Sequence, residues 1–171
     1  MGRNARRAGS FPEYRGDGTG RSYTVKSFVV DASVGAKWFL PAAGEPLAAE
    51  AQALLDHYTL GRVRLLVPDF FWAELGNVLW KAVGRSRITE QQAESSIAQA
   101  RQLGLLVLPA LDLLVEALRV ALSSGRSVYD SIYVATAISG RVQLLTADER
   151  LVNATGSRYP VRWLGALPSL L

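Results

Sequence analysis

The chain has 171 residues, 49% of them apolar and 20% charged, which is the composition of an ordinary globular domain and excludes disorder throughout. Cysteine is absent and His57 is the single histidine, so a disulfide framework, a thiolate zinc site, a cysteine nucleophile and paired-histidine chemistry are excluded. No apolar run is long enough to cross a bilayer, and we expect no membrane partner.

The net charge of +4 is concentrated at the start of the chain, where residues 1–27 hold six basic and two acidic side chains. Residues 1–24 are rich in Gly, Arg and Ser and have no apolar period, so we predict a flexible basic leader followed by one folded domain over 25–171. The leader lacks the apolar segment of a secretory signal, and we expect a cytoplasmic protein. The basic leader either attracts phosphate groups through its positive charge or is solvated chain with no binding role.

Runs of β-forming residues alternate with segments of helical spacing from residue 28 onward. The expected strands are 28–31, 63–67, 105–108, 142–146 and 161–164. The expected helices are about 33–40, 46–60, 69–84, 89–103, 112–124, 129–139 and 147–154. The strands are mostly apolar without alternation, which is typical of strands buried on both faces. This order predicts an α/β fold with a mostly parallel central sheet of four to five strands, covered by helices on both sides.

Local signals predict where three of the helices begin. Asp69 follows a strand and is expected to be an N-cap. Thr89 and Gln92 have the spacing of a capping box, in which each side chain bonds the backbone of the other. Thr146 and Glu149 have the same spacing, and we expect a second capping box there.

Four carboxylates fall near the carboxyl ends of the predicted strands, where open parallel sheets collect their ligands. Asp31 ends the first strand, and Asp148 follows the fourth. Glu74 and Asp130 lie inside strongly apolar helices, where an unpaired carboxylate is costly. Each acid also has an ordinary interpretation: a first-turn or capping role for the three aspartates, and for Glu74 a pair with a core Arg or Lys or with Asn77.

Taken together, several carboxylates at one edge of a sheet repel one another, unless they are protonated or neutralised by a hard cation. Oxygen ligands without His or Cys favour Mg²⁺ or Mn²⁺. Such ions bind phosphate oxygens and activate water for attack on phosphorus. The acidic set therefore predicts cleavage of phosphodiesters.

Four stretches of the chain resemble, in order and spacing, the PIN-domain ribonucleases, and within them the VapC-type toxins of prokaryotic toxin–antitoxin pairs. They are 29–33 (VVDAS), 68–81 (PDFFWAELGNVLWK), 127–137 (SVYDSIYVATA) and 144–151 (LLTADERL). The resemblance covers about 28–165 and implies a PIN-like three-layer α/β/α domain. It also implies an acidic site for Mg²⁺ or Mn²⁺, with two hydroxyls orienting a carboxylate, a water or a phosphate: the acids are Asp31, Glu74, Asp130 and Asp148, and the hydroxyls are those of Ser33 and Thr146.

By the same resemblance, we expect a metal-dependent endoribonuclease that attacks RNA phosphodiesters with an activated water and leaves 3′-hydroxyl and 5′-phosphate ends. The family pattern also implies a cognate antitoxin and a homodimer. Apolar residues in the helices at 46–60 and 69–103 are the expected partner surface. Lys37 and Arg126 are candidates for contact with the RNA backbone, although Lys37 also fits a solvated helix position.

Two other classes of function are compatible with parts of the pattern. One is a catalytically inactive PIN-like module that binds RNA or protein through its acidic surface. The other is a phosphoryl-transfer enzyme with Asp31 as nucleophile or phosphoacceptor. The haloacid-dehalogenase form is disfavoured because Ser33 stands where that class needs a second aspartate, and the receiver form because no lysine follows the late strand.

Overall fold

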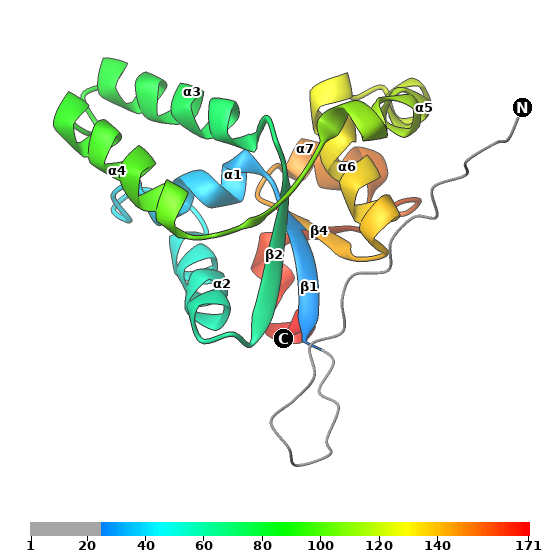
Figure 1. Cartoon of the computed structure of the whole chain (residues 1–171), viewed down its shortest axis with the longest axis horizontal. Coiled ribbons are helices and arrows are strands. Elements are labelled where there is room, and N and C mark those ends of the chain that lie inside the picture. The colour runs from blue at the N-terminus through cyan, green and yellow to red at the C-terminus, as the bar shows by residue number, and fades with distance from the viewer. Residues whose placement is uncertain (1–24) are drawn as a thin grey trace, which may run out of the picture.

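The computed structural model describes residues 25–171, and the predicted basic leader lies outside the described residues. The centre of the domain is a five-stranded sheet in the order β3-β2-β1-β4-β5, in which every pairing is parallel (Figure 1). The predicted parallel sheet is therefore confirmed. Its strands are β1 (Lys26–Val30), β2 (Val63–Pro68), β3 (Leu106–Leu108), β4 (Gln143–Thr146) and β5 (Val161–Trp163).

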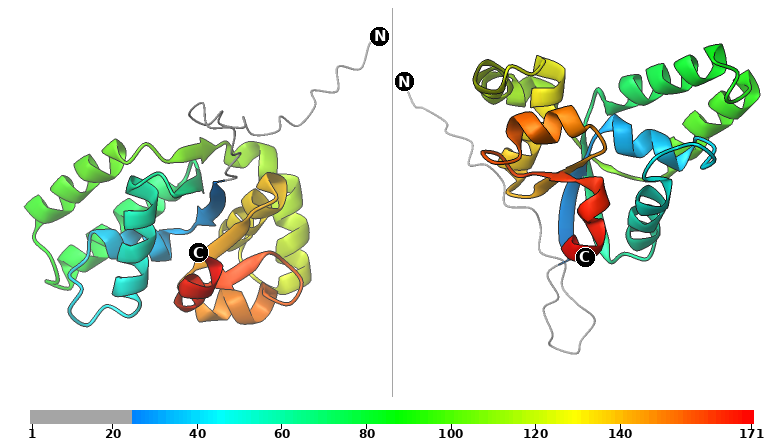
Figure 2. Two further views of the ribbon diagram at one scale, coloured as in Figure 1. Left: turned by 90° about the horizontal axis from the view of Figure 1, so that it is seen from below. Right: turned by 180° about the vertical axis from the view of Figure 1, so that it is seen from behind.

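Helices lie on both sides of this sheet and complete a three-layer α/β/α domain (Figures 1 and 2). One side carries α1 (Ala32–Gly35), the 3-10 helix η1 (Ala36–Trp38), α2 (Ala48–Thr59) and a projecting hairpin of α3 (Phe71–Gly84) and α4 (Glu90–Gln102). The other side carries η2 (Ala110–Leu113), α5 (Leu114–Ser124), α6 (Val128–Gly140) and α7 (Glu149–Thr155). The sequence did not predict the last two elements, η3 (Leu164–Ala166) and α8 (Leu167–Leu170).

Burial of the strands explains their apolar texture, with one exception. Val29, Val30 and Leu144 are fully inaccessible in the centre of the sheet. Leu106 and Val107 in β3 remain 46% and 42% exposed. The expectation that every strand is buried on both faces is wrong for β3, because this strand lies at the edge of the sheet and pairs only with β2. No helix in the described part of the chain is both long and apolar enough to cross a bilayer.

The strand order places a topological switch point between β1 and β4. The chain leaves β1 through α1 and α2 on one side, whereas the connection that enters β4 runs through α5 and α6 on the other. Connections that diverge in this way leave a crevice outside the carboxyl ends of the two central strands. Asp31 and Thr146 stand at those two ends, and the backbone N–H of Asp31 lies 3.5 Å from the carbonyl oxygen of Leu145.

Of the three predicted helix starts, one is confirmed and two are wrong. The capping box of Thr89 and Gln92 is present at the start of α4. Asp69 does not cap α3, because its Oδ1 instead accepts a hydrogen bond from the backbone N–H of Ala110, 3.2 Å away in η2. The N-cap of α7 is Asp148 rather than Thr146. In both cases the side chain forms a hydrogen bond with a residue distant in sequence and does not cap the helix that the local spacing predicts.

A partly buried ion cluster ties the tip of the α3–α4 hairpin to the loop after η1. Glu45, in the loop after η1, lies 2.6 Å from Nζ of Lys37 and 2.7 Å from Nη2 of Arg87 in the turn of the hairpin. Burial of Glu45 acts to raise its pKa, but the hydrogen bonds from the two cations outweigh it and hold the pKa below its ordinary value. The expected solvated position of Lys37 is wrong, because its side chain is only 8% exposed and pairs with Glu45. Its contact with RNA stays a prediction.

Exposed apolar side chains gather on a surface that the sequence did not predict. In the helices expected to form a partner surface, Leu60 at the end of α2 and Trp80 are the large exposed apolar residues among those described. A larger group lies along η2 and α5: three of its members are three and four residues apart in α5, on one face of that helix, and the fourth lies just before them in η2. We call this group the α5 stripe; it consists of Leu111, Val115, Leu118 and Leu122.

Candidate active site

Asp31 is the most deeply placed acid at the switch point, with an exposed fraction of 6%. Its Oδ1 accepts hydrogen bonds from the hydroxyl of Ser33 at 2.5 Å and from the N–H of Val34 at 3.1 Å, so the side chain caps α1. Its Oδ2 accepts from the hydroxyl of Thr146 at 2.5 Å. Burial, with a smaller contribution from the negative charge of Glu74, raises the pKa of Asp31 to about 6 against the effect of these bonds.

The hydroxyls of Ser33 and Thr146 connect the two central strand ends. Ser33 Oγ accepts from the backbone N–H of Ala147 at 3.0 Å while it donates to Asp31. Thr146 Oγ1 accepts from the backbone N–H of Asp148 at 2.9 Å while it also donates to Asp31. Each hydroxyl therefore fixes the orientation of the Asp31 carboxylate, which is one of the roles that the resemblance implies for them.

Glu74 is half-buried on α3, and its partner is a tyrosine. The hydroxyl of Tyr133, from α6, donates to Oε2 of Glu74 at 2.5 Å. Burial raises the pKa of Glu74, the bond from Tyr133 opposes this rise, and the charge of Asp130 adds to it. Within residues 25–171, neither Asp31 nor Glu74 forms an ion pair with a basic side chain. The expected pairing of Glu74 with a core Arg, Lys or Asn77 is therefore wrong.

Asp130 and Asp148 share a single arginine. Ser127 is the N-cap of α6 and accepts from the backbone N–H of Asp130, so the Asp130 carboxylate is not used for capping. Asp148 caps α7 with Oδ1, which accepts from two backbone N–H groups. One nitrogen of Arg126, Nη2, lies 3.0 Å from Oδ2 of each aspartate. The ordinary capping role is thus wrong for Asp130 and correct for one oxygen of Asp148.

All four predicted acids line one cleft of about 450 Å³. Among the described residues, no group of three or more acidic or histidine side chains lies close enough together to hold a metal ion, so the four acids line the walls of the cleft rather than meet at one point. Among the other residues that line the cleft, two with ionisable side chains were not predicted as site residues, Lys81 and Tyr133. Both carry a detectable signal, because Lys81 lies two helical turns after Glu74, and Tyr133 lies one turn after Asp130.

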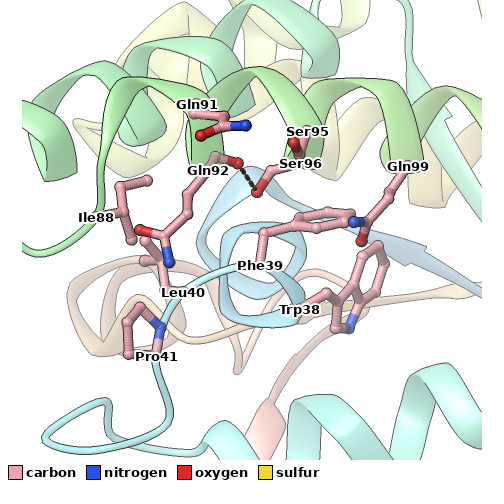
Figure 3. A pocket seen from close by; sticks show the side chains of 10 residues that line it. All are labelled: Trp38, Phe39, Leu40, Pro41, Ile88, Gln91, Gln92, Ser95, Ser96 and Gln99. Atoms are coloured by element: carbon pink, nitrogen blue, oxygen red, sulfur yellow. Dashed lines mark hydrogen bonds between the residues drawn. The ribbon is translucent and has the colours of Figure 1, made fainter.

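A second cleft, of about 480 Å³, lies between the segment that follows α1 and the helix α4 (Figure 3). Its walls combine aromatic rings, such as Trp38 and Phe39, with the amides and hydroxyls of α4. The hydroxyl of Ser96 already donates to the carbonyl oxygen of Gln92 at 2.8 Å. None of its lining residues is acidic or basic, so of these two clefts only the acidic one offers ionisable groups for chemistry.

Comparison with solved structures finds the same fold in other proteins, and three of them are as follows. PAE2754 from Pyrobaculum aerophilum is 27% identical, with a TM-score of 0.60, and the match covers 85% of this chain and 90% of that one. A toxin–antitoxin complex from Klebsiella pneumoniae contains a chain that is 16% identical, with a TM-score of 0.52 over 78% of this chain and 94% of that one. VapC20 of Mycobacterium tuberculosis, described as a sarcin-ricin loop cleaving toxin, is 16% identical, with a TM-score of 0.54 over 75% of this chain and 95% of that one.

At the level of sequence, no curated protein matches the chain. The sequence profile of the PIN domain does match it, over residues 28–156. The matched region begins in β1 and ends just after α7, so it includes all four acids of the cleft. On the strength of this match, and of the three-layer fold that accompanies it, the chain belongs to the PIN domain family.

Proposed function

We propose that this protein is a metal-dependent endoribonuclease of the VapC toxin type, acting in the cytoplasm. The observation that carries the proposal is the pair formed by Asp31 and Glu74. These carboxylates come from different elements of one cleft, have no basic partner among the described residues, and lie close enough for the charge of Glu74 to raise the pKa of Asp31. Such a pair favours a ligand that brings positive charge into the cleft.

The donor set fits Mg²⁺ or Mn²⁺, since the four acids offer only carboxylate oxygens, the ligands that hard cations prefer. Asp31, Glu74, Asp130 and Asp148 would hold the ion after moving closer together than they lie in this structure. When bound, such an ion polarises a phosphate oxygen and makes a neighbouring water more acidic. We place the nuclease domain over residues 25–171, because β5 completes the sheet beyond the residues that match the family profile.

The other side chains of the cleft orient its acids and supply positive charge. Ser33 and Thr146 hold the two oxygens of Asp31 in hydrogen bonds, and Tyr133 holds one oxygen of Glu74, Oε2. Lys81 is exposed at the wall of the cleft and has no ion pair among residues 25–171, so it is suited to contact an RNA phosphate. Attack by water on phosphorus would leave 3′-hydroxyl and 5′-phosphate ends.

The proposed partners are an RNA substrate, a cognate antitoxin and a second copy of the chain. The solved relative from Klebsiella is itself part of a toxin–antitoxin complex, which supports an antitoxin as partner. The α5 stripe supports the homodimer, because its four large exposed apolar side chains form the kind of patch that marks interaction surfaces.

Cleavage of a structured RNA by the chain purified free of antitoxin tests the proposed activity. We expect cleavage with Mg²⁺ or Mn²⁺, none with a chelator, and a loss of about 100-fold in rate for Asp31→Asn, as is usual when a group that stabilises transition-state charge is removed. Asp69→Asn is the matched control, because Asp69 also follows a central strand but contacts Ala110 outside the cleft. Equal cleavage by the wild type and Asp31→Asn would refute the assignment.

The same experiment distinguishes the alternative, a catalytically inactive PIN-like module that binds RNA or protein. Such a module would bind RNA without cutting it, and its melting temperature would not respond to millimolar Mn²⁺. A rise in melting temperature with Mn²⁺, which Asp31→Asn reduces, supports the enzyme instead, because a ligand that binds only the folded state stabilises it.

A further inference from the structure

Arg126 occupies the space between two of the four acids of the cleft. Its Nη2 atom lies 3.0 Å from Oδ2 of Asp130 and 3.0 Å from Oδ2 of Asp148. The side chain of Arg126 is 23% exposed, and those of the two aspartates are 32% and 35% exposed, so all three are partly shielded from water. A cation at this position brings together acids from the first turn of α6 and from the N-cap of α7.

The contacts of Arg126 are dominated by charge attraction, because its hydrogen-bonding capacity is poorly used. A guanidinium group binds a carboxylate best with two parallel N–H donors, as a fork. Here a single nitrogen serves both carboxylates, and the buried Nε has no hydrogen-bond partner. An unpaired buried donor is unfavourable, so the position of Arg126 is explained by attraction to two negative charges at once.

The four acids of the cleft therefore fall into two unlike pairs. Asp31 and Glu74 have no basic partner among the described residues, whereas Asp130 and Asp148 already share one positive charge. We propose that Arg126 is an internal counter-ion that competes with a divalent cation for Asp130 and Asp148. This inference rests on the proposed function, because the cation in question is the one that the nuclease would need.

Two consequences follow for the protein without metal and for the protein with it. Without a divalent ion, Arg126 stabilises the fold by reducing repulsion between Asp130 and Asp148. With the ion, the guanidinium group has to leave at least one of these carboxylates, and the affinity for metal is lowered by the cost of breaking that contact. Arg126 thereby determines how readily the cleft takes up metal.

Binding of Mn²⁺ to the full chain, measured by electron paramagnetic resonance and by calorimetry, tests this competition without an activity assay. We expect Arg126→Gln to bind Mn²⁺ at least about 10-fold more tightly than the wild type does, equivalent to about 1.4 kcal/mol. Its melting temperature should be lower than that of the wild type in chelator, and Mn²⁺ should raise it by more. Arg119→Gln is the matched control, because it removes the same charge from an exposed pair with Glu116 on α5, and its affinity should stay within about twofold of the wild type.

Equal or weaker Mn²⁺ binding by Arg126→Gln would overturn the proposal, and weaker binding would mean that Arg126 supports the metal site. If neither protein binds Mn²⁺, both this inference and the proposed metal-dependent function fail. If both bind Mn²⁺ equally tightly, only the proposed role of Arg126 is refuted.

A titration of the wild type with Mg²⁺ covers the case in which Arg126→Gln does not fold. The Nε–H resonance of Arg126, assigned with Arg126→Lys, should shift as Mg²⁺ binds, and an unchanged resonance would refute the competition.

Discussion

The buried carboxylate of Asp31 makes the stability of the metal-free protein depend on pH. Its pKa of about 6 in the folded protein lies above the ordinary value of 3.8, so the folded state binds a proton more tightly than the unfolded chain does. Its contribution to stability is therefore fully present below about pH 4 and is lost as the pH rises through 6. At pH 8 the charged Asp31 lowers the free energy of unfolding by about 3 kcal/mol, at 1.36 kcal/mol per pKa unit.

Replacing this carboxylate with a neutral amide should remove that dependence. With a chelator present, we expect Asp31→Asn to be more stable than the wild type by about 2–3 kcal/mol at pH 8 and by little or nothing at pH 4. Urea denaturation between these pH values measures the difference, with Asp69→Asn as the control. A stability difference that does not change with pH would mean that Asp31 is not the titrating group.

At this scale the sequence predicted which side chains matter but not what each one contacts. Asp31 and Glu74 stand out in the sequence because a carboxylate among apolar neighbours is costly unless a cation or a hydrogen-bond donor lies near it. The bond from Tyr133 to Glu74 joins residues 59 positions apart, and the bond from Thr146 to Asp31 joins residues 115 positions apart. No local pattern encodes such pairs, since they depend on which strands become neighbours in the sheet.

Among the secondary-structure elements, the contact between α1 and α3 controls the separation of Asp31 and Glu74. Gly35 in α1 faces the buried ring of Phe71 in α3, and a Cβ atom at Gly35 would lie 2.5 Å from its Cζ atom. We expect Gly35→Ala to push the two helices apart, to lower the free energy of unfolding by about 1–3 kcal/mol and to reduce RNA cleavage. Urea denaturation and a cleavage assay measure the two effects.

Gly76, in the interior of α3, provides the matched control for Gly35. A Cβ atom there would meet nothing within 4 Å, and alanine is a better helix former than glycine. Gly76→Ala should therefore raise the free energy of unfolding by about 0.5–1 kcal/mol and leave cleavage unchanged. If both variants were stabilised, the contact between Gly35 and Phe71 would not be tight.

Periodicity and turn residues predicted most of these elements, and the errors have physical reasons. The expected helix 33–40 is a single turn of α-helix followed by the 3-10 helix η1. The elements η3 and α8 carry no signal comparable to the capping box at Thr89. Asp69 and Thr146 were misassigned because tertiary hydrogen bonds outweighed local capping preferences, which are worth only about 1 kcal/mol.

For the whole molecule, the α5 stripe predicts how two copies assemble. Val115 is 67% exposed in the middle of the stripe, and a charge there would be buried without a partner in a dimer. We expect the wild type to be a dimer by size exclusion with light scattering, and Val115→Glu to associate at least about 10-fold more weakly while its circular dichroism is unchanged. Leu60→Glu, which changes a 63% exposed leucine at the end of α2, should remain dimeric. Dissociation of both variants, or of neither, would contradict an interface at this stripe.

The alternation of strands and helices predicted the architecture of the domain, but it did not predict which apolar residues remain exposed. From the sequence we expected exposed apolar residues on α2, α3 and α4. In the structure, most of those residues pack against the sheet or against each other. Which face of an apolar helix remains uncovered depends on the packing of layers from distant parts of the chain. The residues of α5 therefore became identifiable as a surface only in the folded molecule.

The ion cluster at Glu45 has a mechanical consequence for how the cleft admits a nucleic acid. The hairpin that carries Glu74 is anchored at its far end as well as at its base, through Arg87 and the shared carboxylate that also holds Lys37. These two ion pairs resist a swinging motion of the hairpin. In the proposed nuclease we therefore expect an entrance of nearly constant width, which would admit pliable RNA loops more easily than stiff duplexes.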